Sequence, residues 1–159
     1  MLYGCVLSAG PERDVAVGRA AAATDGDKRQ AGSDTDATDA VTVDLSQNTA
    51  TGGAGNDVLQ MVEDVIGSDF DDHITGNDGN NVLIGGDGID TLTGGAGDDT
   101  LTTGSGKDDI ELTENFGNDT VTDFNIAEDT VDLSKLGITD FATLQAMMSD
   151  DCTGNAVIV

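Results

Sequence analysis

Carboxylate and amide side chains recur at every ninth residue in the middle of this chain. Five consecutive windows of nine begin at Gly67, and the sixth residue of each window is Asp72, Asn81, Asp90, Asp99 or Asp108. Two outlying copies of the pattern place Asp57 and Asp119 at the same position. Calcium prefers hard oxygen ligands, whereas zinc and copper favour His or Cys, which do not recur here. The spacing therefore predicts a series of calcium sites.

The residues around each acid indicate how it would be positioned. Glycines come early in each window and permit the positive φ angles of a tight turn that exposes main-chain carbonyls. The last three residues are β-prone, and the eighth is always aliphatic, so one side chain points inward and two point outward. The inward positions are Leu59, Ile74, Leu83, Leu92, Leu101, Ile110 and Val121.

One window is thus one turn and one short strand, which is half of a coil. Two windows, or 18 residues, close a coil, and successive coils stack as parallel strands about 4.8 Å apart. Turns on the same side then recur every 18 residues. We expect Asp72, Asp90 and Asp108 on one side, and Asn81, Asp99 and Asp119 on the other. Asn81 keeps an oxygen but lacks a charge, so its site should be weaker.

The windows 85–93 (GGDGIDTLT) and 94–102 (GGAGDDTLT) match the pattern G-G-x-G-x-D-x-U-x at every defined position. This pattern resembles the calcium-binding repeat of the RTX, or hemolysin-type, family. The resemblance covers residues 52–122 and, more loosely, 41–159. It implies an all-β, right-handed parallel β-roll, a β-solenoid whose bound ions are Ca²⁺. The sixth-position residues would bind the ions together with main-chain carbonyls of the turns, those of Gly86, Gly88, Gly95, Gly97 and Gly106.

Three segments are expected. Residues 1–30 are electrically neutral overall, and residues 1–40 lack periodicity, so we expect 1–40 to be disordered or a truncated lead-in. Residues 41–122 would form the β-roll. Residues 123–159 resemble the capping region of serralysin-type C-terminal domains, and the apolar spacing of 140–148 predicts one helix there. The final Val157-Ile158-Val159 matches the apolar ending of type I exported proteins in part.

The composition restricts the partners of the chain. It carries 31 acidic and 6 basic residues, for a formal net charge of −25. Nucleic acid is a poor partner for such a surface. No stretch is long enough to span a bilayer. The resemblance implies export through a type I secretion apparatus and an extracellular location, with folding on calcium binding.

Catalytic signatures are weak in this sequence. His73 is the only His, no HExxH motif occurs, and we expect His73 on the surface of a protein that is not an enzyme. Two alternatives remain open: the C-terminal remnant of a secreted protease, lipase or epimerase, or an adhesive or ice-binding face. Such a face would use outward Thr91, Thr93, Thr100 and Thr102. The sequence leaves open the oligomeric state and whether Cys5 and Cys152 pair.

Overall fold

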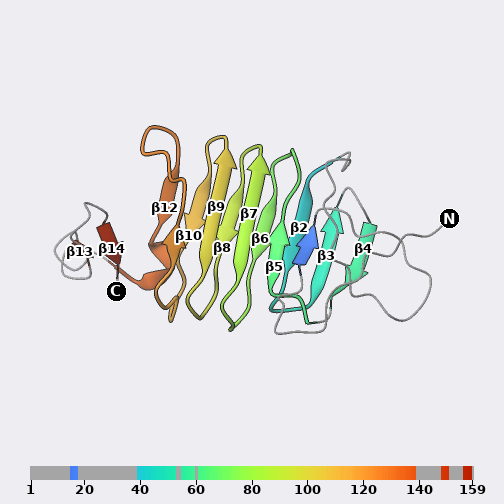
Figure 1. Ribbon diagram of the computed structural model, residues 1–159, viewed down its shortest axis with the longest axis horizontal. Coiled ribbons are helices and arrows are strands. Elements are labelled where there is room, and N and C mark those ends of the chain that lie inside the picture. Colours follow the sequence, from blue (N-terminus) through green and yellow to red (C-terminus); the bar gives the residue numbers. More distant parts are fainter. Residues whose placement is uncertain are drawn as a thin grey trace.

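A computed structural model describes residues 15–17, 39–52, 55–59, 61–138, 148–150 and 156–158. The chain forms a parallel β-solenoid with a β-sheet on each side (Figure 1). The first sheet has the order β1 (Val15–Val17), β5 (Asp64–Ile66), β7 (Val82–Asp87), β9 (Thr100–Ser105) and β11 (Thr120–Val121). The predicted all-β solenoid is confirmed.

The second sheet runs in the order β12 (Thr130–Asp132), β10 (Asp109–Glu111), β8 (Thr91–Thr93), β6 (His73–Thr75), β2 (Val41–Asp44), β3 (Thr49–Gly52) and β4 (Gly55–Val58). A separate antiparallel pair joins β13 (Met148–Asp150) to β14 (Ala156–Ile158). The helical content of the described residues is one 3₁₀ turn, η1 (Ser134–Leu136). From β4 to β12 the chain therefore alternates between the two sheets, whereas β2, β3 and β4 follow one another in the second sheet.

The core is a double stack of aliphatic side chains between the two sheets. Leu83 pairs with Leu101 in the first sheet, and Ile74 pairs with Leu92 in the second. These four side chains are fully buried, with 0% exposure, and Ile110 has 1%. Burial of each side chain of this size contributes about 1.5–3 kcal/mol. The aliphatic eighth position of each window thus points inward, as predicted.

The spacing between stacked residues grows towards the C-terminus. Strand partners are 18 residues apart from β5 to β9, but Leu101 pairs with Val121 and Ile110 pairs with Val131. The chain absorbs the additional residues in two places, Leu112-Thr113 and Asp123, and then resumes the nine-residue pattern as 114–122 and 124–132. The parallel stack therefore continues to β12, beyond the limit at residue 122 expected from the sequence.

The window 52–60 differs from expectation. It was predicted to be another turn and parallel strand, but β3 and β4 form antiparallel pairs, β3 with β2 and β4 with β3. The reversal occurs after Leu45, where Asn48 has a φ of 59°. Strand β2 itself lies parallel to β6 and occupies the place of a preceding coil. Asp57 consequently lies in strand β4 of this hairpin, and its role as a calcium ligand stays a prediction.

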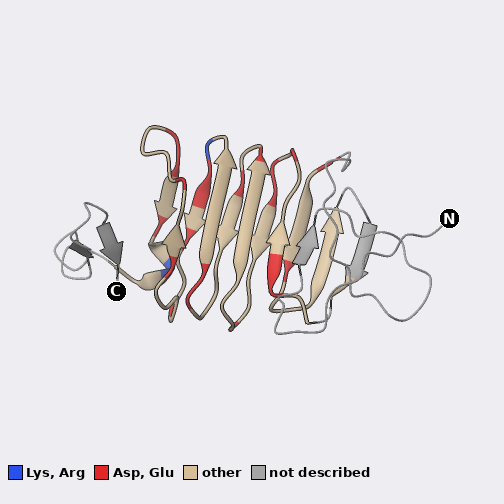
Figure 2. Cartoon of the chain, in the orientation of Figure 1, with Lys and Arg blue, Asp and Glu red and all other residues tan. Residues whose placement is uncertain are grey.

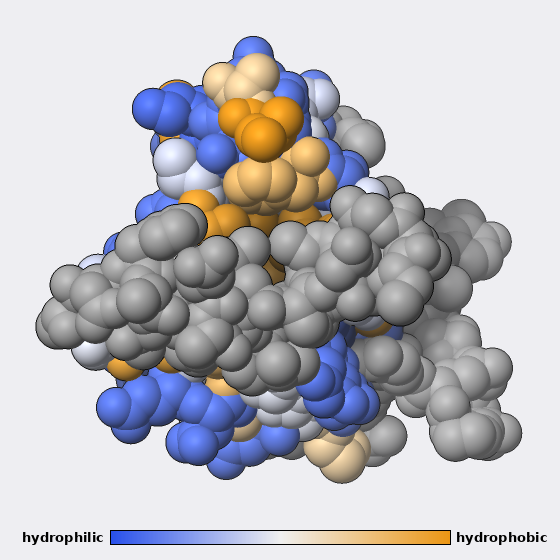
Figure 3. All heavy atoms as spheres, turned by 90° about the vertical axis from the view of Figure 1, so that its left-hand side faces the viewer, coloured by the Kyte–Doolittle hydropathy of each residue, from blue (hydrophilic) through white to orange (hydrophobic). Residues whose placement is uncertain are grey.

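Other expectations concern the ends of the chain. Most of residues 1–40 lie outside the described residues, but strand β1 pairs in parallel with β5. The helix predicted at 140–148 also lies outside them, apart from Met148, which begins β13. At the C-terminal end of the stack, apolar surface is visible beside hydrophilic surface (Figure 3). Ile126, the most exposed large apolar residue described, is 90% exposed there.

Candidate metal centre

The sixth-position residues form two ladders along the stack. The main-chain N–H of each donates to Oδ1 of the equivalent residue in the next coil: Asp72 to Asp90 (2.8 Å), and Asp90 to Asp108 (2.9 Å). On the other side the donors run from Asn81 to Asp99 (2.7 Å) and from Asp99 to Asp119 (3.0 Å). The structure thus brings together the two predicted rows. Figure 2 shows acidic residues gathered in the turns and at strand ends.

Four consecutive turns share positive φ angles at two positions, and we name them the open turns: 85–90, 94–99, 103–108 and 114–119. Their second and fourth residues all have positive φ; in the first of them Gly86 has 127° and Gly88 has 130°. A side chain at Gly86 would also overlap the carbonyl oxygen of Ser68 in the preceding coil. The corresponding residues of the later open turns are Gly95, Gly97, Gly104, Gly106, Asn115 and Gly117.

In the open turns, sixth-position carboxylates present a buried oxygen that accepts no hydrogen bond. This is true of Oδ2 of Asp90, Asp108 and Asp119. The Asp90 and Asp108 side chains are 0% and 1% exposed. A Cβ on Gly85 would overlap Oδ2 of Asp90, so the first glycine of the turn leaves room for that oxygen. An unpaired buried carboxylate oxygen is costly unless a cation or donor meets it.

Main-chain carbonyls face the same gaps. The carbonyl oxygens of Gly86, Gly88 and Gly97 point at the glycines stacked on them in the next coil, Gly104, Gly106 and Gly117. The gap between the turns 85–90 and 103–108 therefore contains two carbonyl oxygens, and Asp108 Oδ1 lies near Gly106. All of these atoms are hard oxygen donors, the class that calcium prefers.

Three other turns have a different conformation, and we name them the closed turns: 67–72, 76–81 and 124–129. Their second residues are Ser68, Asn77 and Asn125, and neither these nor the fourth residues have positive φ. The second residue donates its N–H to the sixth: Ser68 to Asp72 Oδ2, Asn77 to Asn81 Oδ1 (2.9 Å) and Asn125 to Asp129 Oδ2 (2.7 Å). The side-chain oxygen of each accepts the N–H of the fourth residue. A short Ser or Asn side chain thereby closes the turn.

Hydrogen bonds satisfy the sixth-position side chains of the closed turns. Asp72 Oδ1 accepts the Val41 N–H and the Ser68 hydroxyl, both at 2.8 Å. Asn81 donates through Nδ2 to the Glu63 carbonyl at 2.7 Å. Asp129 Oδ1 accepts the Asp108 N–H at 3.2 Å. The protein itself therefore supplies in these turns the partners that Oδ2 of Asp90, Asp108 and Asp119 lacks.

Burial makes the charges of the open turns costly. It raises the pKa of Asp90 to about 7, and the neighbouring charges of Asp72 and Asp108 act in the same direction. Burial likewise raises the pKa of Asp119 to about 7 and raises that of Asp108. The ladder hydrogen bond to each carboxylate opposes the shift without cancelling it. A cation between the turns would restore the charged form.

The oxygen ligands that the open turns offer fit calcium because they include main-chain carbonyls. Within the described part of the chain, no group of three or more His, Cys, Asp or Glu side chains is placed to hold a metal. One carboxylate for each open turn, together with carbonyls of stacked turns, is therefore the available set. Calcium accepts carbonyl oxygens in numbers and tolerates flexible geometry. Asp90, Asp99, Asp108 and Asp119 would hold the ions, with carbonyls from Gly86, Gly88, Gly95, Gly97 and Gly106.

Sequence reasoning missed the last closed turn. Asp129 continues the row of Asp72, Asp90 and Asp108, although it lies 21 residues after Asp108. A signal for it was present: Asp129-Thr130-Val131 repeats the Asp119-Thr120-Val121 of the previous window. The inserted Asp123 concealed the register. That residue accepts the Thr103 N–H at 2.8 Å and the Gly104 N–H at 2.9 Å, which joins the insertion to the open turn below it.

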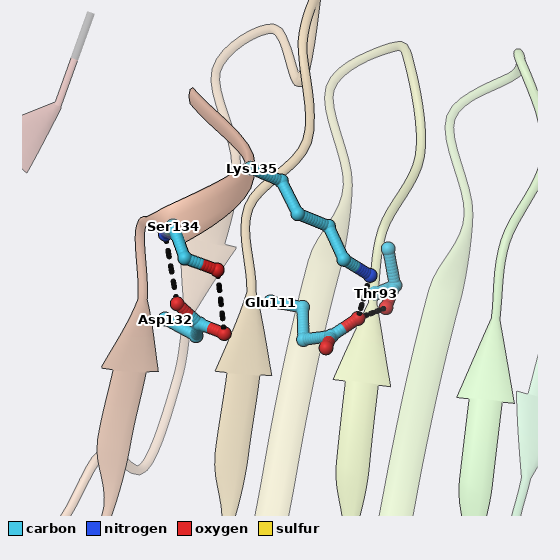
Figure 4. Close-up of polar contacts among 5 residues, drawn as sticks. All are labelled: Thr93, Glu111, Asp132, Ser134 and Lys135. Atoms are coloured by element: carbon cyan, nitrogen blue, oxygen red, sulfur yellow. Dashed lines mark hydrogen bonds and ion pairs between the residues drawn. The ribbon is translucent and has the colours of Figure 1, made fainter. Parts of the chain in front are cut away.

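The remaining surface residues singled out in the sequence are His73 and the outward Thr positions. His73 is exposed, as predicted, and stacks beside Thr91, which in turn stacks beside Asp109. Thr93 is only 5% exposed and donates to Glu111, whose carboxylate also pairs with Lys135 at 2.5 Å (Figure 4). Thr91 therefore has no Thr partner in β6 or β10, whereas Thr100 pairs with Thr120 and the Thr102 hydroxyl lies 2.8 Å from that of Thr122.

Comparison with known proteins agrees with this geometry. The RTX calcium-binding nonapeptide repeat family matches residues 43–60, 62–92 and 84–113, in four copies. The match includes the antiparallel β3–β4 segment as well as the stacked coils. No curated protein matches the chain. In the described residues, no helix is long and apolar enough to cross a membrane. The RTX repeat family binds calcium, and this chain carries four copies of its nonapeptide repeat within residues 43–113.

Proposed function

We propose that the chain is a calcium-dependent folding module of an exported protein, extended in a low-calcium cytosol and folded as a β-roll after secretion. The observation that carries the proposal is the set of buried carboxylate oxygens without hydrogen-bond partners at Asp90, Asp108 and Asp119. Each is a site where folding without a cation leaves a charge unpaired. Calcium that binds the folded state and not the unfolded one stabilises it by mass action.

The net charge of the chain strengthens the coupling between ion and fold. The formal net charge is −25, and residues 31–159 hold 27 acidic and two basic residues. Coil formation stacks carboxylates of equal sign at every turn, so compaction works against repulsion. Calcium bound between the turns both ligates the carboxylates and lowers that repulsion. Extracellular calcium modules operate at about 0.1–1 mM.

Circular dichroism of the whole chain tests this function. In chelator the chain should show little β structure. Calcium at roughly millimolar concentration, the range typical of extracellular modules, should raise the β content. Magnesium at the same concentration should not replace calcium, because it requires octahedral geometry and retains its waters. A spectrum that calcium leaves unchanged would contradict the proposal. Equal folding by magnesium would mean that the turns respond to counter-charge alone.

A further inference from the structure

The two kinds of turn differ in what meets the sixth-position side chain. In open turns the second residue has positive φ, and a carboxylate oxygen is left without a partner in three of the four, at Asp90, Asp108 and Asp119. In closed turns the second residue has no positive φ and gives its N–H to that side chain. The correspondence holds on both sides of the solenoid. It also holds across the change in spacing after residue 111.

We propose that the backbone conformation of the second turn residue decides whether a turn takes a calcium ion. Calcium is then confined to the open turns 85–90, 94–99, 103–108 and 114–119. The closed turns 67–72, 76–81 and 124–129 take none, although two of them carry a buried Asp at the sixth position. This inference rests on the proposed calcium-binding function and assigns its sites within the chain.

The reason is competition for the same oxygen. In the closed turn 67–72, Asp72 accepts hydrogen bonds from the N–H and hydroxyl of Ser68 and from the Val41 N–H. Binding of a cation there would displace donors that the folded protein already supplies. In the open turn 85–90, Asp90 Oδ2 has no donor to lose. A sixth-position Asp is thus insufficient for a calcium site. The closed turns form the two ends of the stack without bound ions.

Asn115 shows that residue type alone does not decide the conformation. It is an Asn at the second position, as in the closed turn of Asn77, but it has a φ of 66°. Its neighbour Phe116 is buried at 8% exposure and belongs to the core cluster. The equivalent neighbour of Asn77 is the exposed Asp78. Packing of the third residue thus accompanies the open conformation where glycine is absent.

The turn 76–81 offers a test with matched charge. Its fourth residue is already Gly79, so Asn77→Gly with Asn81→Asp produces the full open-turn pattern. The control is Asn77→Ala with Asn81→Asp, which has the same charge and differs by one Cβ that disfavours positive φ. Both variants lose the Asn81 donor to the Glu63 carbonyl, so that loss cancels in the comparison.

Calcium stoichiometry is the readout, measured by isothermal titration and native mass spectrometry of the full chain. The glycine variant should bind one more ion than the parent, and the alanine control should bind the same number as the parent. An additional ion in the alanine control would overturn the proposal, because a carboxylate would then suffice. Equal stoichiometry in both variants would also overturn it, because opening the turn would then have no effect.

A second comparison does not depend on the folding of those variants. Asp90→Asn should lose one bound ion, whereas Asp72→Asn, at the same position of a closed turn, should lose none. Loss of an ion from Asp72→Asn would overturn the assignment of the closed turns. Failure of the parent to bind calcium at all would instead contradict the proposed function. The two ideas can therefore fail separately.

Discussion

The turns at the two ends of the solenoid and those in its middle satisfy the same buried position in different ways. At the ends, Ser68 and Asn125 use a main-chain N–H and a short polar side chain to complete the partners of Asp72 and Asp129. In the middle, glycines with positive φ withdraw that donor and leave carboxylate oxygens facing carbonyls of the stacked turn. A repeat can therefore keep its acid and its coil while exchanging a protein donor for an ion.

The difference is instructive because the two kinds of turn share a ladder and a core. Asp72, of a closed turn, donates to Asp90, of an open turn, and Asp108 donates to Asp129 in the opposite order. Stacked units of this kind gain stability from their neighbours. Closed turns thus extend the array at both ends without requiring an ion at its outermost layer.

The largest effect should come from the core that both kinds of turn share. Leu92→Ala removes a fully buried side chain from the aliphatic stack, and we expect a loss of about 2–5 kcal/mol in the free energy of unfolding. Chemical denaturation at saturating calcium measures it. Ile89→Ala, at a residue that is 58% exposed, is the control and should change stability little. A loss in the control equal to that of Leu92→Ala would contradict the inward stack.

The next effect separates ligand from charge in an open turn. Asp90→Asn keeps an oxygen for the Asp72 N–H but removes the carboxylate, so the calcium midpoint should rise by about tenfold or more, since calcium affinity follows ligand charge. Asp87→Asn removes the same charge from an exposed position of the same turn and should shift the midpoint little. Calcium titrations followed by circular dichroism compare the two. Similar shifts would show that charge count, and not position, governs binding.

A smaller effect is expected in a closed turn. Ser68→Ala deletes the hydroxyl that donates to Asp72 and accepts the Phe70 N–H, with an expected cost of about 1–2 kcal/mol. The cost should be the same at every saturating calcium concentration, because no ion is involved. Ser105→Ala, at an exposed residue of an open turn, is the matched control and should cost less than about 0.5 kcal/mol. If more calcium repaired the Ser68 variant, the distinction between the turns would fail.

The smallest effect should come from the ion pair on the side of the stack. Lys135 donates to Glu111 at 2.5 Å, but the lysine is half exposed, so solvent and salt screen the pair (Figure 4). Lys135→Ala should lower the melting temperature slightly at low salt and leave it unchanged at high salt. Lys107→Ala, at an exposed turn residue, provides the comparison. A large loss that persists at high salt would assign Lys135 a structural role that its exposure does not suggest.

Much of the stack could be predicted because its period is written directly in the chain. Leu92 and Asp90 lie at fixed places in a nine-residue pattern: Leu92 occupies the predicted inward position, and Asp90 lies in the predicted row of stacked acids. The hairpin of β3 and β4 could not be predicted in this way, because its sequence GGAGNDVLQ carries the same pattern as the stacked windows. Its antiparallel course depends on β2 pairing with β6, a contact between segments distant along the chain.

The sequence by itself determined the coil, the aliphatic core and the two rows of acids, since each follows from local turn chemistry repeated with one period. Only the tertiary structure decided which of these acids find hydrogen-bond partners in the protein and which keep a buried oxygen without one. Asp72 and Asp90 occupy the same position of their windows, but the partners of their carboxylates come from the turn conformation and from the coil stacked against it. Hydrogen-bond satisfaction of a buried group depends on neighbours in space, and a nine-residue window does not contain them.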